Sequence, residues 1–123
     1  MCAQHGRTRA VKHLDEAQQY EERAHPELRA LIDALDALDL DNVEAELANE
    51  IVTLEFADGA KYVINSHRAA RQIWMAAERT AWHFDWVDDK QAWIDDKRGH
   101  ELWQTVSTAL SEKLGRSVRL TRG

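Results

Sequence analysis

The chain has 123 residues, the size of a single domain, and 44% of them are hydrophobic, including five tryptophans that suit a bulky core. Its one cysteine, Cys2, excludes an intramolecular disulfide and a cysteine-based metal site, and no apolar run approaches the ~20 residues that span a membrane. The formal net charge of −6 argues against nucleic acid and anionic lipid as partners, because both would be repelled.

The N-terminal residues differ in charge from the rest of the chain. Residues 1–14 contain Arg7, Arg9 and Lys12 and no acidic residue, and they have no apolar signal-peptide region. We therefore expect a flexible basic extension over 1–14, one domain over 15–120 and a short tail over 121–123. The lone cysteine and the missing signal peptide favour a cytoplasmic protein.

The first helix is predicted from apolar residues at helical spacing. They are Tyr20, Ala24, Leu28, Leu31, Ile32, Leu35 and Leu38. Pro26 interrupts this pattern, and proline is tolerated only in the first turn of a helix. Either the helix begins near Pro26, or a kinked helical turn from about Asp15 precedes it. Asp33 and Asp36 lie beside the apolar stripe and are expected to face solvent.

After Asp41 the apolar period changes from 3.6 to 2, which predicts strands. Their expected ranges are 43–47, 51–57, 61–65, 71–77, 81–87 and 92–96, with a hairpin turn at Asp58-Gly59. A second helix is expected from Leu102 to a C-cap at Gly115, followed by a strand or tail over 118–120. The predicted fold is an α+β two-layer sandwich, in which two terminal helices pack on one face of an antiparallel sheet of about six strands.

Strand parity places one tryptophan on the open face of this sheet. In the stretch QIWMA, Ile73 and Met75 share one face, so Trp74 points to the other, as do His83 and Asp85 on the following strand. If Ile73 and Met75 face the helices, Trp74 is either a cross-strand packing partner or a binding hot spot, a role in which tryptophan is enriched.

Seven acidic residues and no basic residue lie between Asp33 and Glu50. Asp39, Asp41 and Glu50 match three positions of an EF-hand calcium loop. Glu44 occupies the position where that loop requires glycine, so an EF-hand is excluded. The run is either an ordinary solvated face or a surface for cations such as iron or for a basic protein. Because the sequence has neither a nucleophile elbow nor a glycine-rich phosphate loop, we do not expect an enzyme.

Three stretches resemble the frataxin family, in particular its bacterial CyaY type. They are VTLEFADGAKYVINSHRAARQIWMA at 52–76, HFDW at 83–86 and WIDDKRGHELWQTV at 93–106. The resemblance runs from about Tyr20 to Leu120, and its most specific parts are the DG hairpin ending in Asn65, the QIW block and the Trp93 to Leu102 stretch. The chain departs from the family at His67 and Ala69, which replace a glutamine and a nearby proline.

The resemblance implies a frataxin-like sandwich with a non-enzymatic role in iron–sulfur cluster assembly. Members of the family bind ferrous and ferric iron weakly, and dock on the complex of a cysteine desulfurase with the iron–sulfur scaffold protein. The implied iron site, called the acidic ridge below, consists of Asp33, Asp36, Asp39, Asp41, Glu44 and Glu46. The implied partner contacts are Asn65, Trp74, Asp33 and Asp36.

Two further functions stay open at this point. One is an acidic protein-interaction module whose metal binding is incidental, and the other, ranked third, is an iron-oxidising enzyme. The metal-free chain is expected to be a monomer. Whether the protein donates iron or controls the rate of assembly does not follow from the sequence.

Overall fold

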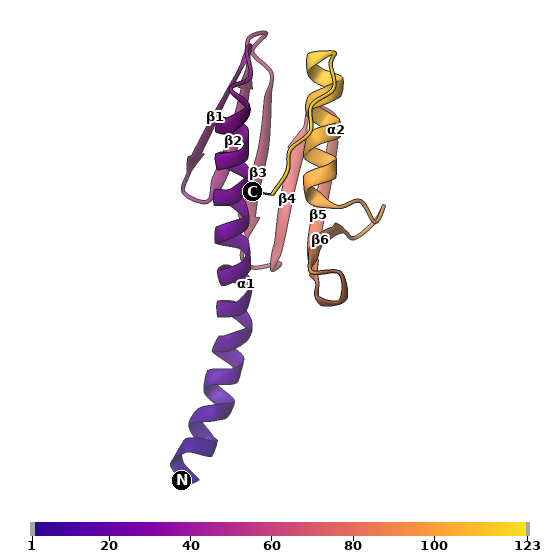
Figure 1. The fold of residues 1–123 in the computed structure, drawn as a ribbon. Coiled ribbons are helices and arrows are strands. Elements are labelled where there is room, and N and C mark those ends of the chain that lie inside the picture. Colours follow the sequence, from indigo (N-terminus) through magenta and orange to yellow (C-terminus); the bar gives the residue numbers. More distant parts are fainter. Residues whose placement is uncertain (1, 123) are drawn as a thin grey trace.

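The computed structural model describes the backbone of residues 2–122 and the side chains of residues 18–122. In it, two helices cover one face of a six-stranded antiparallel sheet, whose strands follow one another in chain order (Figure 1). The elements are α1 (Cys2–Leu38), β1 (Val43–Ala48), β2 (Ile51–Phe56), β3 (Lys61–His67), β4 (Gln72–Ala77), β5 (Thr80–Val87), the 3-10 turn η1 (Asp88–Lys90), β6 (Ala92–Asp95) and α2 (Leu102–Leu114). The predicted α+β two-layer sandwich is confirmed.

Helix α1 is longer than the sequence predicted, and its N-terminal turns extend past the end of the sheet (Figure 1). It begins at Cys2 and continues through Pro26, so the predicted start near Pro26 or Asp15 was wrong. Proline removes the bond to the carbonyl of Glu22, but both residues are exposed and water can bond that carbonyl instead. The flexibility expected of residues 1–14 stays a prediction.

The core lies between the helices and the inner face of the sheet. The inward strand residues are Val52, Leu54, Phe56, Tyr62, Ile64, Ile73, Met75, Ala77, Phe84 and Trp93. The predicted stripe of α1 is buried against them except for Leu38, which is 39% exposed. Leu38 lies in the last turn of α1 and lines a surface hollow with Leu120 and Thr121, so it faces the C-terminal segment and not the sheet.

Helix α2 begins and ends through local contacts. The Glu101 carboxylate accepts hydrogen bonds from the backbone N–H groups of Trp103 and Gln104, which stabilises the first turn. Gly115 ends the helix at a φ of 69° and donates its N–H to the carbonyl of Ser111. The predicted C-cap at Gly115 is confirmed. Neither helix in the described chain combines the length and the apolar character needed to cross a bilayer.

The C-terminal segment runs back along the two helices as an extended tail (Figure 1). Val118 and Leu120 are buried, and their backbone N–H groups donate to the hydroxyls of Ser111 and Ser107, at 2.8 Å and 2.9 Å. Of the two predicted forms of 118–120, the structure has the tail and not the strand. Through these contacts the C-terminal tail is part of the core.

Glu27 of α1 is a buried acid that contacts both α2 and the C-terminal tail. Glu27 is 1% exposed, and its carboxylate accepts hydrogen bonds from Trp103 Nε1 and from Arg122 Nη2, the latter at 2.5 Å. Burial raises the pKa of the Glu27 carboxyl, although the Trp103 bond and the Arg122 charge oppose that rise. Glu27 therefore joins α1, α2 and the tail.

Candidate functional site

The outer face of the sheet carries the residues that the parity argument placed there. Ile73 and Met75 are buried, whereas Trp74 is half-buried on the opposite side. The register sets Trp74 directly across from Asn65 on β3 and from His83 on β5. The predicted orientation of Trp74 is confirmed, and so is that of His83.

Trp74 is the middle ring of a three-ring stack. The centroid of its indole lies 3.7 Å from that of the His67 imidazole, with an interplanar angle of 13°. It lies 4.4 Å from the centroid of the His83 imidazole, with an interplanar angle of 22°. The indole N–H donates to Gln72 Oε1 at 2.8 Å. The amide of Gln72 in turn donates to Asp85 Oδ1, so the tryptophan is held by both its faces and its edge.

The stack, together with Gln72, forms a fixed aromatic surface that we call the Trp74 platform. The Gln72 amide also donates to Asp96 Oδ2 at 3.1 Å, which links β4 to the end of β6. Behind it, the hydroxyl of Tyr20 donates to the backbone carbonyl of Gln72 at 2.8 Å, which ties α1 to the same strand. An aromatic side chain ordered before binding loses little rotamer entropy when a partner covers it.

Sequence reasoning missed two members of this platform, His67 and Gln72, and the two carboxylates that hold Gln72. His67 was identified only as a departure from the family, and Gln72, Asp85 and Asp96 were given no role. Parity already placed Gln72 beside Trp74, at i and i+2 on one face, and this was the signal available for it. The contact of His67 is diagonal across two strands, so it depends on their register.

The acidic ridge follows the end of α1 and the edge strand β1. All six of its residues are exposed: Asp33, Asp36, Asp39, Asp41, Glu44 and Glu46. Asp39 has a φ of 47° at the point where the chain leaves the helix and turns toward β1. Within residues 18–122, no ion pair or side-chain hydrogen bond joins any of the six to another residue.

Only part of the ridge converges on one place. Asp36, Asp39 and Glu44 line a hollow of ≈ 360 Å³, together with Leu35 and Val43. Asp33 instead lines a separate hollow beside Arg119. Among the described residues, no group of three or more His, Cys, Asp or Glu side chains is placed to hold a metal ion. The ridge is thus an open anionic surface and not a preformed coordination cage.

The register adds a charge to this surface that the sequence prediction did not include. Glu44 on β1 lies directly opposite Glu55 on β2, and like charges in this position repel. Glu44 and Glu46 point to the same side of the sheet as Trp74. Three interstrand steps of about 4.8 Å separate β1 from β4, or roughly 14 Å, so one partner could cover both the ridge and the Trp74 platform.

Asn65 is half-buried beside the platform. Its side-chain amide donates to the carbonyl of Ser66 at 3.3 Å, which leaves its oxygen available on the outer face. Asn65 on β3 also lies directly opposite Ile51 on β2, one of the two large hydrophobic residues exposed in the described chain. Polar and apolar groups therefore alternate between the ridge and Trp74.

Comparisons with known proteins agree with this architecture. A family model described as a frataxin-like domain matches residues 13–116. The iron–sulfur cluster assembly protein CyaY of Tolumonas auensis is 41% identical over 87 residues, which cover 71% of this chain and 81% of that protein. The protein of the same name from Thioalkalivibrio sulfidiphilus is 34% identical over 98 residues, which cover 79% and 92% of the two chains.

Solved structures of frataxins have a backbone similar to that of this chain. The frataxin of Psychromonas ingrahamii has a TM-score of 0.77 at 23% identity, covering 85% of this chain and 97% of that chain, which supports the fold. A trimeric frataxin from the yeast Saccharomyces cerevisiae, complexed with ferrous iron, has a TM-score of 0.66 at 27% identity. That match covers 76% of this chain and 87% of the yeast chain.

Proposed function

The chain belongs to the frataxin family, and on that premise we propose that it is a non-enzymatic, iron-binding protein of cytoplasmic iron–sulfur cluster assembly. It would supply iron to that process or regulate it by docking on the complex of a cysteine desulfurase and a scaffold protein. The observation that carries this proposal is a set of unpaired carboxylates at the β1 edge of the sheet, of which Glu44 and Glu46 point to the same side as the ordered Trp74 platform.

Iron would be bound by the acidic ridge. Carboxylate oxygens are hard ligands that suit ferrous and ferric ions, and among residues 18–122 no basic side chain forms an ion pair with any of the six acids. Because its six acids are exposed and spread over a helix end, a turn and a strand, each ion would keep part of its water shell. Binding should therefore be weak and exchangeable, with the hollow between Asp36, Asp39 and Glu44 as its centre.

The partner would meet the ridge through basic side chains and the platform through apolar ones. Complementary charge speeds encounter and fixes orientation, while a central aromatic residue supplies much of the affinity. Trp74 would be that anchor, Asn65 a polar contact next to it, and Asp33 and Asp36 the charged rim. The metal-free protein would act as a monomer, so that the sheet face is free for the partner.

Calorimetric titration of the desulfurase–scaffold complex with variants of this chain tests the docking proposal. Trp74→Ala should lose ~2 kcal/mol or more of binding free energy, about 30-fold in affinity. Asp36→Lys should also weaken binding, and more at low salt than at high salt. Glu22→Lys is the matched control, since it makes the same charge change on an exposed part of α1 outside the ridge. If Asp36→Lys and Glu22→Lys lose the same binding affinity, the ridge influences docking only through nonspecific charge.

A second function is favoured by one observation, the lack of a three-ligand group among the described residues. In this alternative the chain is an acidic protein-interaction module and its metal binding is incidental. A titration with ferrous iron at tens of micromolar, followed by the amide NMR signals of residues 33–46, separates the two. Shifts centred on Asp36, Asp39 and Glu44 support the iron-binding function. If those signals do not move while the desulfurase complex still binds, the interaction module is the correct function.

A further inference from the structure

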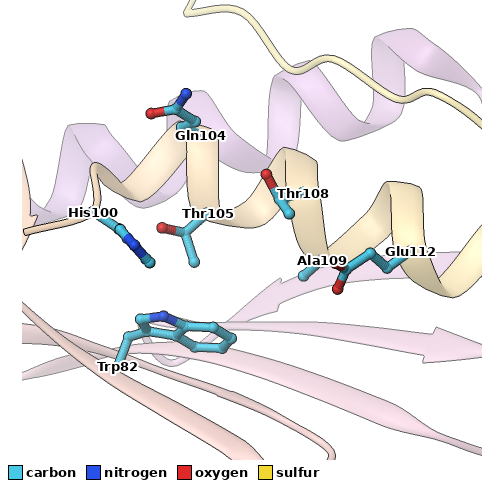
Figure 2. Close-up of a pocket in the computed structure, with 7 residues that line it drawn as sticks. All are labelled: Trp82, His100, Gln104, Thr105, Thr108, Ala109 and Glu112. Atoms are coloured by element: carbon cyan, nitrogen blue, oxygen red, sulfur yellow. The ribbon is translucent and has the colours of Figure 1, made fainter. Parts of the chain in front are cut away.

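The two helices contact the inner face of the sheet in different ways behind the Trp74 platform. Helix α2 faces Trp82 of β5 across a hollow of ≈ 470 Å³, as Figure 2 shows. Helix α1 instead makes direct polar contacts with the β3–β4 hairpin, through the consecutive residues Tyr20 and Glu21. The hairpin that carries most of the platform is therefore bonded to α1 from behind.

A single phenol oxygen joins both strands of this hairpin. The Tyr20 hydroxyl donates its one proton to the backbone carbonyl of Gln72 at 2.8 Å, so the Ser66 hydroxyl, 2.5 Å away, is the donor to the Tyr20 oxygen. Gln72 belongs to the platform, and Ser66 directly precedes His67, which pairs with Gln72 at the end of the hairpin. Tyr20 thus bonds to one platform residue and to the immediate neighbour of another.

The surroundings of Tyr20 keep its hydroxyl in place as a donor. Tyr20 is 7% exposed, and its ring packs edge-on against Trp93, with centroids 5.9 Å apart and an interplanar angle of 84°. Burial raises the pKa of the Tyr20 hydroxyl above its ordinary value of 10.0, although the hydrogen bonds from Ser66 and from the His67 backbone oppose that rise. The phenol therefore keeps its proton at neutral pH.

Glu21 and the turn itself add to this support. The Glu21 carboxylate lies 2.6 Å from Nη2 of Arg68, the residue that follows His67. On the other side of the turn, Ala70 donates its backbone N–H to His67 Nδ1 at 3.3 Å. The imidazole that covers one face of Trp74 is thereby held through its neighbour and through its ring.

The orientation of Trp74 depends on the residues that α1 holds. His67 stacks on one face of the indole, and Gln72 accepts the hydrogen bond of the indole N–H. Both lie at the end of the hairpin to which Tyr20 is bonded, so a shift of that end would move both contacts together. A binding group keeps its geometry only when the residues around it are themselves fixed.

We propose that Tyr20, assisted by Glu21, is a positioning residue for partner binding. It does not contact the partner, but fixes the end of the β3–β4 hairpin so that Trp74 is presented in one orientation. This inference rests on the proposed function, because the surface that Tyr20 positions is the one proposed to dock on the desulfurase–scaffold complex.

Tyr20→Phe tests the proposal, because it keeps the ring and removes only the hydroxyl. We expect the indole N–H signal of Trp74, assigned by its loss in Trp74→Phe, to shift in proton–nitrogen NMR spectra. Affinity for the desulfurase–scaffold complex, measured by calorimetry, should fall about fivefold, which corresponds to the net contribution of one hydrogen bond. Tyr62→Phe is the matched control and should change neither quantity. Tyr62 is 6% exposed on the inner face of β3, and within residues 18–122 its hydroxyl makes no hydrogen bond.

Combining Tyr20→Phe with Trp74→Ala separates positioning from a general loss of stability. If Tyr20 acts through Trp74, removing its hydroxyl should not weaken binding further once Trp74 is absent. A purely structural role would give the same fivefold loss in both backgrounds. Glu21→Gln should lower the affinity of the parent about twofold, as expected for a partly exposed ion pair. Glu22→Gln, the same change at an exposed neighbour, should leave it unchanged.

Three results would overturn the proposal. They are an unmoved Trp74 signal in Tyr20→Phe, an affinity of Tyr20→Phe equal to that of the parent, and a loss of affinity that persists unchanged in the Trp74→Ala background. If the parent itself does not bind the complex, the proposed function is wrong, and the NMR signal decides the positioning separately. In that case a shift of the Trp74 signal in Tyr20→Phe supports the role of Tyr20, and an unmoved signal refutes it.

Discussion

Replacing Trp74 by alanine removes a known set of contacts from a half-buried side chain. Two stacked rings, at 3.7 Å and 4.4 Å, contribute about 0.5–1.5 kcal/mol each, and the hydrogen bond to Gln72 contributes a similar amount. Since the platform is partly exposed and water replaces some of what is lost, we expect the lower half of this range. The free energy of unfolding should fall by ~1.5–3 kcal/mol, or about 5–15 °C in melting temperature.

Trp93→Ala is the core control for this measurement. Trp93 is 1% exposed and packs edge-on against Tyr20 and Trp86, with ring centroids 5.9 Å and 5.7 Å away. Its truncation should cost ~3–5 kcal/mol, which unfolds many domains of this size. Trp74→Phe keeps a ring in the stack but removes the indole N–H, so it should cost about 1 kcal/mol.

Urea unfolding monitored by far-ultraviolet circular dichroism measures all three variants without depending on tryptophan fluorescence. If Trp74→Ala is as destabilising as Trp93→Ala, the platform belongs to the core and its use as a free binding surface is refuted. If Trp74→Ala has no effect on stability, the stack is not formed in solution. Either result would contradict the geometry of His67, Trp74 and His83 described above.

Other predictions concern the ridge, the buried acid and the tail. Asp33→Lys combined with Asp36→Lys should raise the melting temperature at low salt, and added salt or divalent cations should raise that of the parent; a parent melting temperature unaffected by both would contradict this. Burial raises the pKa of Glu27, so the folded state binds this proton more tightly than the unfolded state. The resulting stabilisation is complete below the ordinary pKa of 4.5 and is lost as pH rises through the folded value. Urea unfolding from about pH 4 to pH 7 should therefore favour Glu27→Gln progressively over the parent, and a flat difference would exclude this titration. Leu120→Ala, at a side chain 5% exposed, should cost ~2–5 kcal/mol by the same method, against almost nothing for the exposed Thr121→Ala.

The parts of the fold that the sequence predicted are those governed by local rules. Alternating residues in the strands, the Asp58-Gly59 turn and the Gly115 cap each depend on neighbours a few positions away, and all are present in the structure. Pro26 was misjudged because tolerance of proline depends on whether the lost bond faces water. The burial of Glu27 had no local signal, since its partners lie 76 and 95 residues away in the chain.

The same distinction applies to the candidate site. Parity was sufficient to place Trp74 on the outer face, but the diagonal contact with His67 required the register of β3 and β4. The run of acidic residues was evident from charge, the six ridge positions came from the resemblance to the frataxins, and the structure shows all six exposed. Charge alone did not indicate that Asp36, Asp39 and Glu44 share a hollow while Asp33 faces Arg119, because the angle between the helix end and β1 decides it.

The tail contacts impose an order of events on synthesis at the ribosome. Val118, Leu120 and Arg122 close the core against residues near the start of the sheet domain, such as Glu27. A ribosome exposes the chain from its N-terminus, so helix and sheet residues leave the exit tunnel while the segment that closes their core is still inside it. Until residue 122 emerges, the hydroxyls of Ser107 and Ser111 lack the N–H donors of the tail, and Glu27 lacks Arg122. Completion of this domain is therefore a step that follows translation of its last residues.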